Sequence, residues 1–204
     1  MNVAVLGGTG PFGRGLAGRL VAEGFQVVIG SRDPQRAREV AAEIGCTGLR
    51  NEGAVGGMDI VVLAVSADAV IETAHRIRDW LRSPLLSVAS ELSFAAGSAR
   101  PKIQRKSLAE RTAEIVDVPV VAGLHSLAAG KLAREKPDED AFVCGSDDDA
   151  KTLALELASH VVAGRAIDAG PLKVAVALEA MTAVIVNVNR RYKAHAGIRL
   201  TGIA

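Results

Sequence analysis

The stretch Gly7-Gly8-Thr9-Gly10-Pro11-Phe12-Gly13 decides the fold. It follows an apolar run, Asn2–Leu6, that is typical of a buried parallel strand, and it precedes a helical pattern of apolar residues. Gly8, Gly10 and Gly13 have the spacing of the dinucleotide fingerprint. In that pattern the first glycine permits a tight turn, the second lets the backbone approach a pyrophosphate, and the third lets helix and strand pack closely. Because free amides and the dipole at a helix start favour phosphate, the stretch predicts a phosphate-binding turn.

The second predicted strand ends at the position that distinguishes NAD from NADP. NAD-binding chains place an Asp or Glu about 20 residues past the glycines, where it holds the ribose 2′-hydroxyl. Here Ser31 and Arg32 fall in that position, and Arg36 follows one helical turn later. A hydroxyl and two guanidinium groups suit a 2′-phosphate, which favours NADP(H). The alternative is that both arginines are solvated and that Asp33 supplies the carboxylate of an NAD site.

Composition excludes several classes of protein. The chain has 204 residues, a net charge of +1 and 3% aromatic residues, so neither a basic patch nor stacking side chains indicate nucleic-acid binding. Cys46 and Cys144 match no metal-ligand spacing and are expected to be free thiols in a reducing compartment. No uncharged apolar run reaches the roughly 18 residues of a membrane span, and no leader pattern precedes the first strand. We therefore expect a cytoplasmic protein without a metal or a membrane anchor.

Strands and helices alternate through the first two-thirds of the chain. This order predicts an α/β fold, a Rossmann-type doubly wound parallel sheet, with a small C-terminal extension dominated by a long apolar helix. The predicted division is an NADP-binding Rossmann domain over 1–140 and a substrate and dimerisation region over 141–204. The segment 95–107 is polar and breaks the pattern, so it is expected to be a long loop. The remaining predicted strands cover 25–29, 59–65, 84–88, 120–122 and 141–144, and the predicted helices cover 34–44, 51–55, 68–81, 109–116 and 147–160.

The last predicted helix, from Pro171 to about Lys193, has almost no polar face. Between Lys173 and Arg190 the only charged residue is Glu179. A helix that is apolar all round must be buried on all sides, and a chain of this size has few elements to bury it. We therefore expect this helix to form a homodimer interface, with Glu179 paired with Lys173 or with a partner subunit, or in contact with the substrate.

Several motifs together resemble the F420:NADP oxidoreductases, the NADPH-dependent reductases of coenzyme F420. Besides the glycine turn and the Gly30-Ser31-Arg32 segment, they are Leu124-His125-Ser126, Val143–Asp148, Asp168–Leu172 and Ala196–Leu200. The resemblance implies direct hydride transfer between the nicotinamide of NADP(H) and the deazaflavin F420 as co-substrate. The cofactors carry such a reaction, while the protein orients them and excludes water.

The resemblance also implies a set of site residues, with His125 as the one candidate catalytic residue. The turn residues Gly8 to Gly13 would bind the pyrophosphate. The other implied positions are Ser31, Arg32 and Arg36 at the 2′-phosphate; Val65 and Ser66 at the nicotinamide ribose; Ser90 and Ala129 at the nicotinamide; and His125, Leu127 and Ala128 at the deazaflavin.

Departures from the family pattern keep two alternatives open. Val65-Ser66 stands where members often carry Ile-Pro, the 89–92 loop lacks a proline, and Val174 and Val176 replace Asn and Arg. The first alternative is an NADPH-dependent reductase of a small imine or carbonyl compound, with Ser126 or His125 as proton donor. The second is a non-catalytic NADPH-binding sensor.

Overall fold

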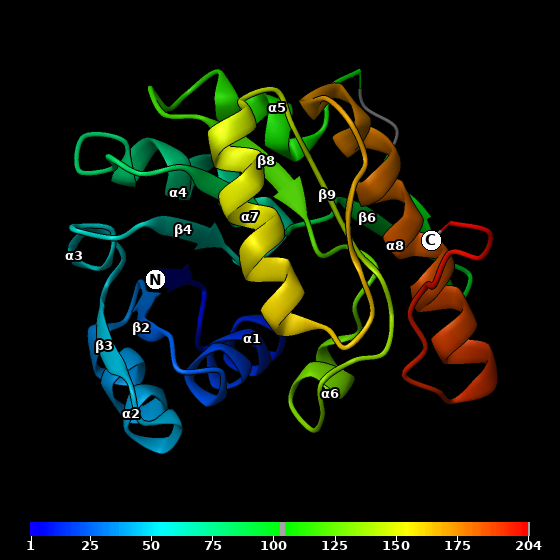
Figure 1. The fold of residues 1–204 in the computed structure, drawn as a ribbon, viewed down its shortest axis with the longest axis horizontal. Coiled ribbons are helices and arrows are strands. Elements are labelled where there is room, and N and C mark those ends of the chain that lie inside the picture. The colour runs from blue at the N-terminus through cyan, green and yellow to red at the C-terminus, as the bar shows by residue number, and fades with distance from the viewer. Residues whose placement is uncertain (103–104, 204) are drawn as a thin grey trace.

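The core of the molecule is one mostly parallel sheet (Figure 1). The computed structural model describes residues 1–102 and 105–203. The sheet order is β10-β9-β8-β5-β4-β1-β2-β3, and every neighbouring pair is parallel except β8 with β9. The strands are β1 Asn2–Leu6, β2 Gln26–Ser31, β3 Thr47–Arg50, β4 Ile60–Leu63, β5 Leu85–Ser87, β8 Val120–Gly123, β9 Ala141–Gly145 and β10 Ala166–Asp168.

The strand order confirms the doubly wound fold. From one edge the strands run β3-β2-β1-β4-β5-β8. With β8 counted as the sixth strand, this is the Rossmann order 3-2-1-4-5-6, with its switch point between β1 and β4. The sheet continues across residue 140, because β9 and β10 add to its edge. β3 and β10 were not predicted from the sequence.

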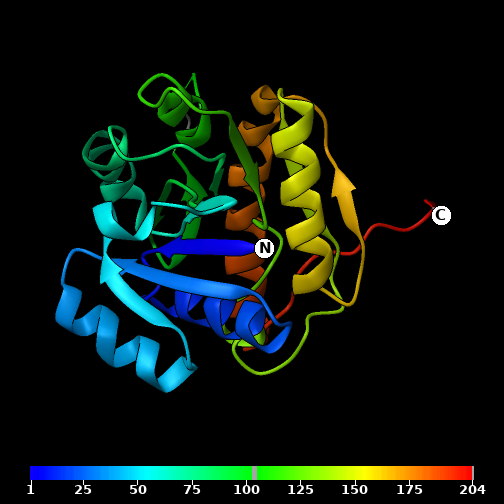
Figure 2. The same cartoon turned by 60° about the vertical axis from the view of Figure 1, so that its left-hand side comes forward.

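Helices cover both faces of this sheet. Alternate residues of β1 point to opposite faces, so Val3 and Val5 join one apolar cluster while Ala4 and Leu6 join the other. Figure 2 shows α7 and α8 on opposite sides of the β8–β9 end. The helices are α1 Pro11–Ala22, α2 Pro34–Ile44, α3 Asn51–Ala54, α4 Val70–Ile77, α5 Leu108–Ala113, α6 Ala129–Leu132, α7 Asp148–Val161 and α8 Ala175–Tyr192, with short 3-10 turns at Ala67–Ala69 and Leu172–Val174.

The prediction of a long loop over 95–107 is wrong for residues 95–101, which belong to a hairpin. An antiparallel hairpin of β6 (Leu92–Ala95) and β7 (Ser98–Pro101) occupies 92–101, and its turn has positive φ at Ala96 and Gly97. Asn187 of α8 holds the hairpin, since its Oδ1 accepts from Ala99 N at 2.7 Å and its Nδ2 donates to Ala99 O at 2.8 Å. A tertiary contact of this kind leaves no local sequence pattern.

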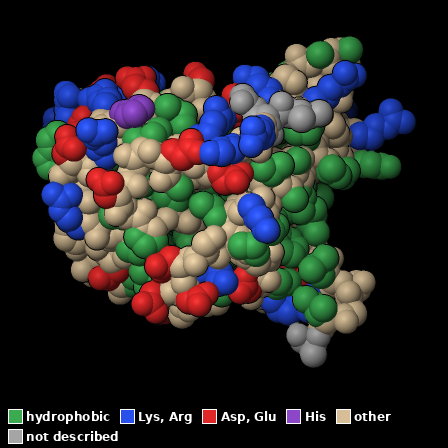
Figure 3. Space-filling view, turned by 90° about the horizontal axis from the view of Figure 1, so that it is seen from above, with side chains coloured by type: hydrophobic (Ala, Val, Ile, Leu, Met, Phe, Trp, Pro, Cys, Tyr) green, Lys and Arg blue, Asp and Glu red, His purple; other side chains and the backbone are tan. Residues whose placement is uncertain are grey.

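The single chain buries α8 on one face, so the expected burial on all sides, which includes a homodimer interface, stays a prediction. Ala175, Leu178, Ala183 and Ile185 are buried, whereas a second face stays exposed. Figure 3 shows apolar side chains gathered on the side where α8 lies. Among the described residues, Leu172–Tyr192 is the one helical segment whose length and composition would allow a membrane span. Long core helices have the same length and composition, so these two properties alone do not indicate a membrane span. The exposed apolar residues here are Phe94, Val176, Val184, Val188 and Tyr192.

Candidate functional site

The glycine turn between β1 and α1 is built by close backbone packing. A side chain at Gly13 would place its Cβ 2.4 Å from Gly7 O, which confirms the predicted close approach of helix and strand. The tight turn itself differs from expectation, because the positive φ of +79° lies at Gly7, while Gly8 lies against the Ile29 side chain. A Cβ at Gly10 would meet only Gly7 O, at 3.4 Å, so the backbone there stays open to a ligand. Pro11 is the first residue of α1, where its missing N–H costs nothing.

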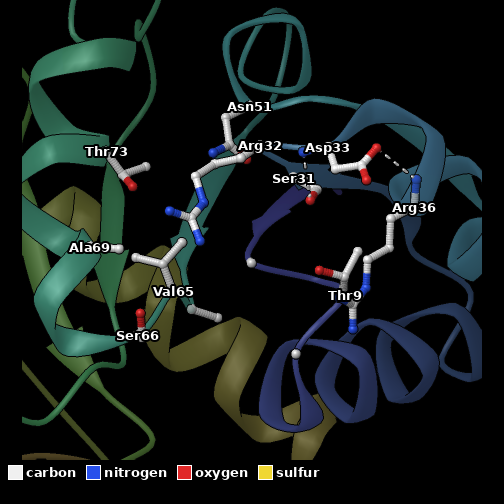
Figure 4. Close-up of a pocket in the computed structure, with 13 residues that line it drawn as sticks. Thr9, Ser31, Arg32, Asp33, Arg36, Asn51, Val65, Ser66, Ala69 and Thr73 are labelled. Atoms are coloured by element: carbon white, nitrogen blue, oxygen red, sulfur yellow. Dashed lines mark hydrogen bonds between the residues drawn. The ribbon is translucent and has the colours of Figure 1, made fainter.

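A cavity of about 340 Å³ opens at the carboxyl ends of β1, β2 and β4 (Figure 4). Parallel strands end at the same edge of a sheet, and ligands bind at this edge near the switch point. Seven of the residues predicted from the sequence line the cavity together: Thr9, Gly10, Ser31, Arg32, Arg36, Val65 and Ser66.

The charges in this cavity suit an anion. In Figure 4, Arg36 extends beside Thr9, and Arg32 lies on the other side of the opening. Asp33 is the N-cap of α2, where its Oδ1 accepts from Gln35 N at 2.9 Å and from Arg36 N at 3.2 Å. Asp33 also lines the cavity, but its Oδ1 is engaged at the helix start and the two guanidinium groups outweigh its charge, which supports the 2′-phosphate interpretation.

Ser66 has a further contact at the rim of the cavity. Its hydroxyl hydrogen-bonds the Asp68 carboxylate and, with backbone groups and nearby Arg32, holds the pKa of that carboxyl below its usual value.

Sequence reasoning missed two polar residues of this cavity, Asn51 and Thr73. Asn51 begins α3 directly after β3 and is 5% exposed, and its Oδ1 has no hydrogen-bond partner within residues 1–102 and 105–203. Gly30 leaves space for it, since a Cβ there would lie 2.8 Å from Asn51 Oδ1. The signal that could have found Asn51 was β3, whose carboxyl end meets the same edge of the sheet.

A second cavity, of about 490 Å³, lies where β8 ends. Phe12, from the start of α1, lines it, and so do the predicted residues His125, Leu127, Ala128 and Ala129. The other wall comes from α8 and the segment after it, within the region 141–204 that was expected to bind substrate, although its individual residues were not predicted. Its polar members are Thr182, Asn189, Arg190 and His195.

His125 is buried, with 4% of its surface exposed. Its Nε2 lies 3.3 Å from Ala89 O, and a carbonyl only accepts, so this nitrogen carries the proton. The Nδ1 atom is a buried acceptor without a partner among the described residues. Burial lowers the pKa of His125 to about 4, so the imidazole is neutral near pH 7 and does not serve as a general acid there.

Ser90 lines neither cavity, but it hydrogen-bonds Thr182, which lines the second one. Its Oγ is 2.8 Å from Thr182 Oγ1, which donates to His125 O at 3.3 Å. Ser126 is fully buried and its Oγ donates to Asp140 O at 2.7 Å. Neither Ser126 nor His125 is therefore placed as the proton donor that reduction of an imine or carbonyl requires.

Two acidic side chains, Asp147 and Glu179, accept hydrogen bonds from backbone amides at the start of a helix. Asp147 caps α7 by accepting from Ala150 N at 2.8 Å, and the described residues contain no cluster suited to a metal ion. Glu179 does not pair with Lys173. It accepts from Leu108 N at 3.0 Å and Ala109 N at 3.2 Å, and burial raises the pKa of its carboxyl to about 7.

Comparison with known proteins agrees with this geometry. Residues 2–91 match the family described as NADP oxidoreductase, coenzyme F420-dependent. The F420-dependent NADP reductase of Methanothermobacter thermautotrophicus is 35% identical over all of this chain and 96% of its own, and that of Methanocaldococcus jannaschii is 31% identical over 100% and 99%. A crystal structure from Arthrobacter sp. FB24 shares the fold with a TM-score of 0.82 at 23% identity, over 99% of this chain and 100% of that one. The chain therefore belongs to the F420-dependent NADP oxidoreductase family.

Proposed function

We propose that this chain transfers a hydride between NADP(H) and the deazaflavin F420. The observation that supports this most directly is the pair of neighbouring cavities. One is polar and cationic around Arg32 and Arg36, and the other is mainly apolar. The turn after β1 connects them, because Thr9 and Gly10 line the first cavity and Phe12 lines the second. Two cofactors bound in this way would meet at the carboxyl edge of the sheet.

The cationic cavity is proposed to bind NADP(H). The amides at the start of α1 would hold the pyrophosphate, and Ser31, Arg32 and Arg36 would hold the 2′-phosphate. Asn51 would accept a hydrogen bond from the ligand, because its buried Oδ1 lines the cavity and has no partner in the part of the chain that the structure describes. Val65 and Ser66 would border the nicotinamide ribose. The nicotinamide would extend toward the second cavity, where Ala129 is part of the lining and Ser90 lies behind Thr182.

The apolar cavity is proposed to bind the deazaflavin. When both molecules are bound, NADPH supplies the hydride and the deazaflavin ring accepts it. Leu127 and Ala128 would exclude water from that encounter. His125 would offer its bare Nδ1 as an acceptor toward the ring while its Nε2–H stays bonded to Ala89 O. The protein thus orients two reactants and needs no side chain that forms a covalent bond.

We further propose that residues 141–204 form a substrate and dimerisation region and that α8 joins two copies of the chain. Val184 is 59% exposed on α8 and Phe94 is 64% exposed on the adjoining hairpin, which is unusual for apolar side chains of this size. The free thiols Cys46 and Cys144 fit a reducing compartment, so we place the dimer in the cytoplasm.

The function is tested by mixing the purified protein with NADPH and oxidised F420 and following the visible absorbance of the deazaflavin. We expect bleaching with NADPH and almost none with NADH. If NADPH binds by calorimetry and no bleaching occurs, the NADPH site stands and the acceptor is a different molecule. Bleaching at equal rates with both nucleotides would contradict the 2′-phosphate site.

A further inference from the structure

The last residues of the chain, 194–203, cross the molecule as an extended segment, here called the C-terminal strap. Figure 2 shows it running from the end of α8 to the β10 edge of the sheet. It starts after Lys193, whose φ of 51° turns the chain away from the helix. Asn189 fixes the first part of the strap, accepting from Ala196 N at 2.6 Å and donating to Ala196 O at 3.0 Å.

An ion pair between the buried Asp140 carboxylate and the partly exposed Arg165 guanidinium fixes the other part of the strap. Asp140 is fully buried, and its carboxylate accepts from Arg165 Nη2 at 2.7 Å and from Leu200 N at 2.8 Å. Asp140 N donates to Ile198 O at 2.9 Å. Arg165 in turn donates to Leu200 O at 2.5 Å and to Ile203 O at 2.6 Å. The Arg165 guanidinium holds the pKa of Asp140 far below its usual range. Both charged groups of the pair therefore bond to backbone groups of the strap.

The start of the strap lies against the second cavity, which is proposed to bind the deazaflavin and is here called the acceptor cavity, because Ala194 and His195 line it. A Cβ at Gly197 would come within 2.6 Å of Ser126 O, so the next part of the strap packs against the segment after β8, between the cavity-lining residues His125 and Leu127. A Cβ at Gly130 would lie 2.8 Å from both Nδ1 and Cε1 of His195. Gly130 and His195 both line the acceptor cavity. The glycine therefore leaves the space that the imidazole ring occupies.

We propose that the C-terminal strap is a wall of the acceptor cavity, with His195 as a residue that binds the acceptor and Asp140 and Arg165 as positioning residues that hold the strap. The proposal rests on the proposed function. An exposed imidazole beside an apolar cavity offers a flat ring and an N–H for a planar heterocycle with carbonyl groups. A buried carboxylate is costly unless it finds partners, and the partners of Asp140 include a backbone group of the strap.

The contact of His195 with the acceptor is tested with His195→Ala, His195→Gln and Gly130→Ala. The matched control is His75→Ala, because His75 is at an exposed position of α4. Loss of one hydrogen-bonding contact predicts an increase of about tenfold in KM for F420 in His195→Ala and Gly130→Ala. KM for NADPH should stay at the wild-type value, and His195→Gln should restore part of the F420 affinity. An unchanged KM for F420 in His195→Ala would overturn the proposal, and so would an equal rise in both KM values.

The anchor is tested without turnover, by limited trypsin digestion followed by mass spectrometry. In the wild type the bond after Arg199 is protected, because Leu200 uses both its N–H and its carbonyl in the anchor. Arg165→Met should open this site to trypsin and raise KM for F420, whereas Arg165→Lys should do so less. Cleavage at the wild-type rate in Arg165→Met would refute the positioning role. A wild-type protein that neither binds nor bleaches F420 would instead refute the proposed function, and this inference with it.

Discussion

At the scale of single residues, the choice between NADPH and NADH depends on Arg32 and Arg36. Both line the cationic cavity, while Asp33 is occupied as a helix cap. Two charge-assisted contacts to a phosphate predict that Arg32→Ala with Arg36→Ala raises KM for NADPH about 100-fold. KM for NADH, which lacks the phosphate, should change little. Steady-state kinetics with both nucleotides measures this, and a double variant that still prefers NADPH would contradict the site.

His125 gives a residue-scale prediction in acid. Its pKa is lowered to about 4 by burial, while in the unfolded chain it stays near 6.5. The unfolded state therefore binds more protons between pH 4 and 6.5, so the contribution of His125 to stability is complete above 6.5 and is lost as the pH falls toward 4. The difference in Tm between wild type and His125→Gln should grow with pH over this window. A constant difference would mean that His125 titrates normally.

The residues also show how far sequence reasoning reaches. The fingerprint and the Ser31-Arg32 pair could be found because ligand-binding residues near the turn occur at fixed spacings along the chain. Thr182 and His195 could not, because they reach the second cavity from elements distant in sequence, and Asn51 could be found only through β3, which was not predicted. Their positions depend on sheet order and helix packing, which no local pattern encodes.

At the scale of elements, the strand–turn–helix start was predictable and the 92–101 hairpin was not. Buried parallel strands leave continuous apolar runs, whereas the hairpin depends on Asn187 of α8. A similar long-range contact links α8 to α5, since Glu179 accepts from the first two backbone amides of α5. The apolar pattern of α8 could not show that its charged residue serves another helix.

The contact between α8 and α5 predicts that stability depends on pH with the sign opposite to that expected for His125. Burial raises the pKa of Glu179 to about 7 from an ordinary value of 4.5. The folded state therefore binds more protons between these values, and stability falls as pH rises from about 4.5 to about 7. The difference in Tm between wild type and Glu179→Gln should shrink over that range by several degrees, the usual scale for a few kcal/mol in a chain of this size. Thermal melts at fixed ionic strength test it, and a difference that grows with pH would contradict the assignment.

At the scale of the whole molecule, the exposed face of α8 supports the proposed dimer. The sequence indicated that this helix needs burial on all sides, and the single chain leaves Val184 and Val188 exposed, at 59% and 38%. The opposite face, with Thr182 and Ile185, borders the acceptor cavity. A second copy packed on the exposed face would therefore complete the burial of α8 without covering residues proposed to bind the deazaflavin.

This argument predicts that Val184→Glu with Val188→Glu converts a dimer to a monomer. Carboxylates buried in an apolar interface without partners cost several kcal/mol, which is enough to separate a dimer at micromolar concentration. Size-exclusion chromatography with light scattering gives the mass directly. Leu49→Glu is the matched control, because Leu49 is 39% exposed on β3, at the opposite edge of the sheet from β10. Calorimetry should show unchanged NADPH binding in all three proteins, which separates loss of the interface from loss of the fold. A wild-type monomer would contradict the proposed dimer. A double variant that stays dimeric would mean that the two copies meet at a surface other than the exposed face of α8.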